Sequence, residues 1–229
     1  MGRSSRPGPQ QKCFAAYLDG LAQVRSYPLP AMTKHGPVVA WIVDYMGFVK
    51  KGSHSVGVAR QYCGQVGQQE RCRVAVSLSV TTSAVSLPIA WRLYLPEVWA
   101  RNRPRREEAG VPEEIGFQTK PQIALEQIRQ AVAQGIPRAV VLADPGYGND
   151  TAFRTGVKEL GLQHLLEVPS SISVWKPGEQ PLPAQRRKEW GRPARRLRRA
   201  ARHQPVSTKQ LARELPSWAW KDVGRCKRS

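Results

Sequence analysis

The stretch Arg138-Ala-Val-Val-Leu-Ala-Asp144-Pro-Gly-Tyr-Gly-Asn-Asp-Thr151 decides the fold, because it joins a strand pattern to a helix start through one aspartate. Ala139 to Ala143 is a continuous apolar run with two valines, which predicts a strand buried on both faces. A proline and a glycine end that strand, and the Asn-Asp pair before Thr151 can cap the next helix. Asp144 therefore lies where ligands and chemistry collect in open α/β sheets. A turn aspartate that only accepts local hydrogen bonds is the alternative.

A second apolar run, Val38 to Val43, also leads directly into an aspartate, Asp44. If the two strands are neighbours in one sheet, the carboxylates of Asp44 and Asp144 converge at the same edge. Converging carboxylates repel each other, and a divalent metal ion is the usual remedy. Two such ions can activate water and stabilise both oxygens of a displacement at phosphorus.

The rest of the chain alternates between strand and helix patterns. The predicted strands are Ser55–Tyr62, Arg71–Leu78, Pro88–Leu95 and Leu165–Val168, and the predicted helices are Cys13–Val24, Lys120–Gln134 and Thr151–Leu160. The polar loop Gln65–Glu70 favours a hairpin, and the Arg-, Pro- and Glu-rich segment Val98–Phe117 reads as a surface loop. These patterns predict an α/β fold in which an antiparallel meander joins a partly parallel sheet with crossover helices.

Composition favours a polyanionic partner. The 229 residues include 36 Lys and Arg against 17 Asp and Glu, a net charge of +19, which points to nucleic acid, with an acidic membrane surface as the alternative. No apolar run approaches the length of a membrane span, and the polar, basic first residues do not form a signal peptide. Four unevenly spaced cysteines do not make a disulfide framework, so a reducing cytoplasm is expected.

Much of the charge lies near the end of the sequence. Residues 170–229 hold 16 Lys and Arg against 4 acidic residues. The densest part is Arg186–Lys188 and Arg192–Arg202, on either side of Trp190. Arginines around a tryptophan suit phosphate contacts with some base stacking, whereas a solvated tail is the alternative.

Two long segments are characteristic of a known family. Trp41-Ile-Val-Asp44, followed by Gly47-Phe-Val-Lys-Lys-Gly-Ser-His-Ser-Val-Gly-Val-Ala-Arg-Gln-Tyr-Cys-Gly64, resembles the first motif of DDE-superfamily insertion-sequence transposases. Leu142-Ala-Asp144-Pro-Gly-Tyr-Gly148 resembles the second motif, and Arg71–Leu95 resembles the strands that follow the first. The two motifs occur in the family's order, and the resemblance covers roughly residues 38 to 220.

The resemblance implies an RNase H-like mixed sheet with crossover helices, plus a basic carboxyl-terminal insertion or tail. It implies Asp44 and Asp144 as catalytic residues and ligands of Mg²⁺ (or Mn²⁺), and metal-dependent cleavage and strand transfer of DNA. The partners would be the element ends and the target DNA in the cytoplasm, near the nucleoid, with no membrane and with self-association left open. The basic residues expected to contact DNA are Lys50, Lys51, Arg60, Arg186, Arg187, Lys188, Arg192, Arg195, Arg196, Arg198, Arg199 and Arg202.

The sequence departs from the family pattern in several places. Tyr45 and Met46 follow the first aspartate, where the family commonly has an acidic residue and then Ser or Thr. The family's third carboxylate, a glutamate on a helix beyond an inserted segment, is not found. The glutamates considered and set aside are Glu167, Glu179, Glu189 and Glu214.

These departures suggest a copy truncated at both ends. We expect a short helical or disordered remnant at 1–36, a partial catalytic core at 37–170 and a basic insertion segment at 171–229. The alternative to an active transposase is an inactive remnant that only binds DNA.

Other sites are less well supported by the sequence. His54, Cys63 and Cys72 could ligate zinc, but their spacing fits no C-x-x-C pair and a fourth ligand is missing, so core or loop roles are favoured. Gly146-x-Gly148 lacks the third glycine and the lysine of a nucleotide-binding loop. No G-x-S-x-G segment supports a hydrolase triad.

Overall fold

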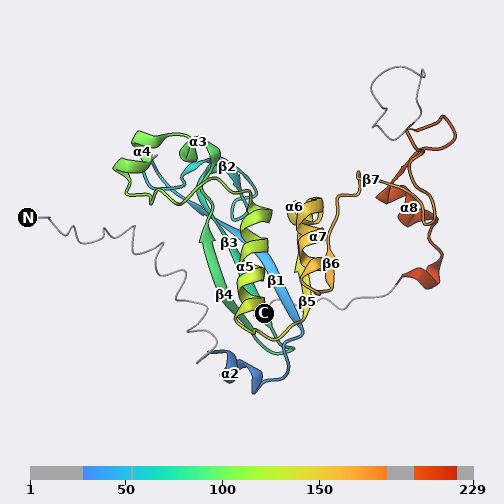
Figure 1. The fold of residues 1–229 in the computed structure, drawn as a ribbon, viewed down its shortest axis with the longest axis horizontal. Coiled ribbons are helices and arrows are strands. Elements are labelled where there is room, and N and C mark those ends of the chain that lie inside the picture. The colour runs from blue at the N-terminus through green and yellow to red at the C-terminus, as the bar shows by residue number, and fades with distance from the viewer. Residues whose placement is uncertain (1–27, 53, 185–198, 221–229) are drawn as a thin grey trace, which may run out of the picture. The chain divides into compact units, whose positions relative to one another are not determined.

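The computed structural model describes residues 28–52, 54–184 and 199–220 (Figure 1). The chain divides into two compact units, Met1–Glu167 and Val168–Ser229, and each is considered by itself. The predicted helix Cys13–Val24 and most of the predicted basic block lie outside the described residues. None of the helices in the described ranges is long and apolar enough to cross a membrane.

The first unit is built on a six-stranded mixed sheet. Its strands are β1 Ala40–Val49, β2 Ala59–Cys63, β3 Gln68–Thr81, β4 Ser86–Leu93, β5 Val140–Ala143 and β6 His164–Leu166. The order is β2-β3-β1-β5-β6, with β4 also paired to β3. Strands β1, β5 and β6 are parallel, and β1 to β4 pair antiparallel. The predicted α/β fold with a meander joined to a parallel section is confirmed.

Strand β1 is longer than predicted. The apolar run was expected to end at Asp44, but β1 continues to Val49. The cause is its partner β3, which has 14 residues and pairs with β1 from Ala40↔Thr81 to Val49↔Cys72. Asp44 therefore lies in the middle of a strand, opposite Ser77, and not at a strand end.

The helices that follow the meander cover one face of the sheet. They are α5 Lys120–Ala133, α6 Pro145–Gly148 and α7 Thr151–Glu159, and a further short helix, α2 Pro28–Thr33, precedes the sheet. Helix α5 begins with a capping box between Thr119 and Gln122, which fixes its first turn and confirms the predicted helix. Asp150 caps α7 through the backbone N–H of Phe153 at 2.8 Å. Figure 1 shows α5 lying across the sheet.

The predicted surface loop Val98–Phe117 is wrong. The segment forms helices α3 Glu97–Ala100 and α4 Arg103–Glu108, and buries Trp99 completely. The Trp99 indole donates a hydrogen bond to the Val58 carbonyl at 2.8 Å and packs in a cluster with Val56, Leu95 and Val111. The sequence pattern missed this cluster because its apolar residues follow no helical or strand period, and Trp99 pairs with Val58, 41 residues earlier in the chain.

Helices cover one face of the sheet more completely than anything covers the other face in the described residues. On the helix side, Trp41, Val43, Val141 and Ala143 are buried with residues of α5 and α7. On the other side, Val140 and Leu142 of β5 are only half-buried, so the prediction of a strand buried on both faces is wrong. The β5 side chains turned away from α5 and α7 lack the second layer that the continuous apolar run implied.

The second unit contains a small two-stranded sheet. Strand β7 Ser173–Val174 pairs antiparallel with β8 Val206–Ser207, which leads into α8 Thr208–Glu214 and a 3-10 turn, η1 Ser217–Ala219. Lys176 forms an ion pair with Glu214 at 2.6 Å, and the Trp175 and His203 rings lie 4.7 Å apart. The pairing of β7 with β8 brings the start of the predicted basic insertion segment beside Val206 and Ser207, which lie within it.

Candidate active site

The strand register brings the two aspartates to the same level of the sheet. Strands β1 and β5 run parallel, and their last paired residues are Val43 and Ala143. Asp44 and Asp144 are the next residue on each strand. Because neighbouring strands are about 4.8 Å apart, this register brings the two side chains together.

The two aspartates are held by different local structures. Asp144 leaves β5 and caps the short helix α6, with Oδ1 accepting a hydrogen bond from the Gly146 N–H at 2.8 Å. Asp44 stays within β1, and its Oδ1 accepts a hydrogen bond from the N–H of Tyr45 at 2.7 Å. Neither carboxylate forms an ion pair with a lysine or arginine in the described part of the chain, so both remain available to a cation.

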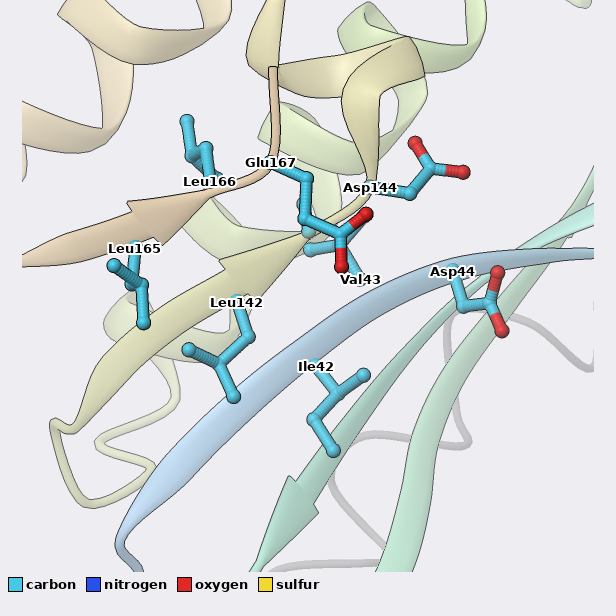
Figure 2. Close-up of a pocket in the computed structure, with 9 residues that line it drawn as sticks. Ile42, Val43, Asp44, Leu142, Asp144, Leu165, Leu166 and Glu167 are labelled. Atoms are coloured by element: carbon cyan, nitrogen blue, oxygen red, sulfur yellow. The ribbon is translucent and has the colours of Figure 1, made fainter. Parts of the chain in front are cut away.

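A cleft of about 550 Å³ opens where β5 and β6 end beside the middle of β1. Its apolar floor comes from Ile42, Leu142 and Leu165, one residue from each of β1, β5 and β6. Figure 2 shows Asp144 and Glu167 just beyond the ends of β5 and β6, and Asp44 within β1, which continues past it. The cleft therefore combines an apolar floor with an acidic end.

Glu167 enters the site because the end of β6 is held tightly. Its backbone N–H donates to the Ala143 carbonyl at 3.0 Å, which continues the pairing beyond β6. A Cβ at Gly148 would lie 1.9 Å from the Glu167 carbonyl oxygen, so only glycine lets α6 pass this close. Sequence reasoning set Glu167 aside because it does not lie on a helix. The described residues nevertheless contain no group of three His, Cys, Asp or Glu side chains that could hold a metal ion.

Tyr147 ties the two motifs together. Its hydroxyl donates to the backbone carbonyl of Asp44 at 3.4 Å, and the Ser77 hydroxyl donates to the same oxygen at 3.4 Å. The Tyr147 ring is buried between Phe153 and Tyr45, at centroid distances of 5.6 and 6.4 Å. The tyrosine of the second motif thus positions the backbone of the first, a role that the sequence analysis did not assign.

The electrostatics of the site centre on Asp144. Burial raises the pKa of the Asp144 carboxyl and the charge of Asp44 raises it further, whereas backbone N–H groups of Gly146 and Tyr147 and the charge of Lys120 lower it. Burial, with Asp144 and Asp44, also raises the pKa of Tyr45. The ionised form of Asp144 is therefore disfavoured at this position, and a bound cation would stabilise it.

The donor set fits Mg²⁺ or Mn²⁺. Hard divalent cations prefer carboxylate oxygens, and Mg²⁺ is commonly held by one or two carboxylates with water and substrate phosphate completing its shell. Asp44 and Asp144 supply oxygen donors on one cleft, and after burial the charge of Asp44 is a further cause of the raised pKa of Asp144. No nitrogen or sulfur ligand lines this cleft.

The other predicted site residues are more dispersed. Lys50, Lys51 and Arg60 are exposed, as are Arg199 and Arg202 of the second unit. The predicted DNA contacts that lie outside the described residues are Arg186, Arg187, Lys188, Arg192, Arg195, Arg196 and Arg198.

The two cysteines considered as zinc ligands are core residues. Cys63 and Cys72 are fully buried in a cluster with Val74, whereas His54 is exposed. Burial, and after it the neighbouring Cys63, raise the pKa of the Cys72 thiol to about 11. Gly47 leaves room for this cluster, because a Cβ there would lie 2.8 Å from the Cys63 sulfur.

Comparison with known proteins gives the chain a family context. A family described as "DDE superfamily endonuclease" matches residues 20–227. The chain is 28% identical over 158 residues to the "Probable transposase for insertion sequence element IS701" of Microchaete diplosiphon, a match that covers 69% of this chain. The chain spans 38% of the length of that relative.

Solved structures add little to this context. Two structures of the Aquifex aeolicus PPX-GPPA enzyme match 58% of this chain at 12% and 11% identity, covering 37% and 36% of theirs. The TM-score of 0.22 is too low for either match to bear on fold or function.

Proposed function

Since the chain belongs to the DDE superfamily of endonucleases, among the insertion-sequence transposases, we propose that it cleaves DNA and transfers DNA strands with a divalent metal ion. The observation that carries this proposal is the parallel register of β1 and β5, with Asp44 and Asp144 on one cleft. The substrates are the ends of the element and its target DNA, reached in the cytoplasm close to the nucleoid.

The mixed sheet with α5 and α7 on one face supports an RNase H-like core at residues 37–170. The flanking regions of this proposal are an amino-terminal segment at 1–36 and a basic segment at 171–229. The second of these carries most of the predicted DNA-contacting arginines, and we propose that it binds the phosphate backbone.

Asp44 and Asp144 would hold Mg²⁺ or Mn²⁺. Metal ions held in this way activate a nucleophile and stabilise the attacking and leaving oxygens at phosphorus. The protein's own part is to fix the carboxylates before the substrate arrives. The Gly146 N–H orients Asp144, the Tyr45 N–H orients Asp44, and Tyr147 with Ser77 holds the Asp44 backbone.

A second candidate function is DNA binding without cleavage. It is favoured by one observation: the described residues hold two converging aspartates but no three-residue metal-binding group. Two carboxylates leave a second metal ion with few protein ligands. Glu167 is a further carboxylate that lines the same cleft.

Nicking of a supercoiled plasmid that carries the element's ends separates the two candidates. Cleavage in Mg²⁺ or Mn²⁺ that is lost in Asp44→Asn and Asp144→Asn supports the nuclease. Loss in Glu167→Gln as well would assign the third ligand to Glu167, while full activity would exclude it. Plasmid binding without nicking supports the second candidate, and no binding at all contradicts both.

A further inference from the structure

Lys120 is a cation beside the aspartate pair to which no role has been assigned. It is the first residue of α5, and the capping box of Thr119 and Gln122 holds its backbone. Its side chain is half-buried, with Nζ 3.9 Å from the centroid of the Tyr45 ring and 5.6 Å from that of the Tyr94 ring. Aromatic faces attract an ammonium group, so the two rings fix its direction.

The Lys120 ammonium has no hydrogen-bond acceptor in the part of the chain that the structure describes. No carboxylate there lies within 4.0 Å of it, although its charge acts on Asp144. Burial lowers the pKa of Lys120, and the charge of Asp144 raises it. A half-buried ammonium thus keeps three N–H donors that no oxygen of the described residues accepts.

A partly buried ammonium without an anionic partner destabilises the folded protein. A partly desolvated charge loses hydration, and ring faces return only part of that loss. The neighbouring Asp44 and Asp144 present the opposite difficulty, because two carboxylates repel an incoming phosphodiester. A cation whose charge reaches Asp144 answers both needs, since lysine binds phosphate as a point charge.

We propose that Lys120 binds a backbone phosphate of the DNA next to the Asp44–Asp144 pair. This inference rests on the proposed function. Tyr45 and Tyr94 act as positioning residues, because their ring faces fix the direction of the lysine ammonium. Tyr45 follows Asp44 directly, at a position where the family commonly has an acidic residue. Contact with Lys120 gives this tyrosine a role.

The alternative is that Lys120 only joins α5 to β1 and the end of β4 through its ring contacts. Both readings predict some loss of stability when Lys120 is replaced. They differ on DNA, because only a phosphate contact changes the dependence of affinity on salt.

The test measures binding of a labelled duplex of about 30 base pairs, containing one element end, in Ca²⁺ over a range of NaCl concentrations. The variants are Lys120→Gln, Lys120→Arg and, as a matched control, Lys158→Gln, which removes an exposed lysine from the last turn of α7. Thermal unfolding checks that each variant is folded. A second series replaces single phosphates by neutral methylphosphonates along the duplex.

We expect Lys120→Gln to lose roughly tenfold in affinity and about one unit of salt slope, with Lys120→Arg retaining the slope and Lys158→Gln unchanged. We also expect one methylphosphonate position to weaken the wild type but not Lys120→Gln. An unchanged salt slope, or weaker binding with no phosphate position losing its effect, would overturn this inference alone. Failure of the wild type to bind the duplex would overturn the proposed function as well.

Discussion

Neighbouring residues on one strand show how differently the two faces of the sheet are used. Trp41 is fully buried under the helices, whereas Ile42, the next residue of β1, forms part of the floor of an open cleft. Along the same strand, Met46 on the cleft side is 45% exposed. The helix-covered face supplies stability, and the open face with its strand ends supplies the groups that could meet a substrate.

Because one face of the sheet is a packed core, the protein can keep two carboxylates close together on the other face. A converging carboxylate pair is unfavourable in the folded protein, and the core on the far side of the sheet offsets that cost. Asp44 points away from the core because its neighbours Val43 and Tyr45 pack against it.

The largest effect is expected from Trp41→Ala on the covered face. The change removes a fully buried indole and its hydrogen bond to the Pro137 carbonyl at 2.9 Å, so the free energy of unfolding should fall by about 3 to 5 kcal/mol. Urea unfolding measures this loss. Ile42→Ala, one residue away, should cost only about 1 kcal/mol. Equal losses at the two positions would show that the open face is covered in solution.

A smaller effect is expected from Gly148→Ala, at the end of α6 beside the end of β6. The new methyl group would collide with the Glu167 carbonyl oxygen, and a backbone shift should cost about 2 to 3 kcal/mol. Gly64→Ala is the control, because a Cβ there meets nothing within 4 Å. If both variants unfold at the wild-type urea concentration, the close approach of α6 to the end of β6 is not real.

Asp144→Asn should raise the melting temperature slightly at neutral pH in EDTA. The raised pKa of Asp144 means that ionising it weakens the fold, and this penalty grows as the pH rises from the ordinary aspartate pKa, about 3.9, through the folded value. The variant's advantage should therefore vanish below about pH 3.9. Thermal unfolding across this range tests the sign. A variant less stable than wild type at every pH would mean that the helix cap outweighs the charge.

The smallest effect is expected from Met46→Thr on the open face. Its side chain is exposed, and threonine suits a strand, so the free energy of unfolding should change by less than about 0.5 kcal/mol. Val74→Thr, a buried position on β3, should cost about 1 to 3 kcal/mol because its hydroxyl lacks a partner. A large fall in the free energy of unfolding for Met46→Thr would contradict the view that this face is open to solvent.

The elements that could be predicted from the sequence are those with local signals. Helix α5 has its cap, and Asp144 has a proline and a glycine after it, so both were placed correctly. Asp44 was placed at a strand end because its continuation depends on β3, which the local pattern does not include. Tyr147 was missed for a similar reason: its hydrogen-bond partner is 103 residues away.

Lys120 and the Trp99 cluster show the same limit. In the sequence, Lys120 is an ordinary first residue of a helix. Its role depends on contacts with the rings of Tyr45 and Tyr94, which are distant in the chain. Trp99 lies in a short apolar run between charged residues, and its hydrogen-bond acceptor is the carbonyl of Val58. Both roles depend on contacts that a window of neighbouring residues does not contain.

The pairing of β1 with β5 also imposes a delay during synthesis, because β1 is made well before its partner. About 100 residues separate the two strands along the chain, and translation proceeds at about 5 to 20 residues per second. For several seconds on the ribosome, β1 has its meander partner but an unpaired edge carrying Trp41, Ile42 and Val43. An unpaired apolar edge of this kind recruits other strands, so the yield of folded protein should depend on how fast β5 is delivered.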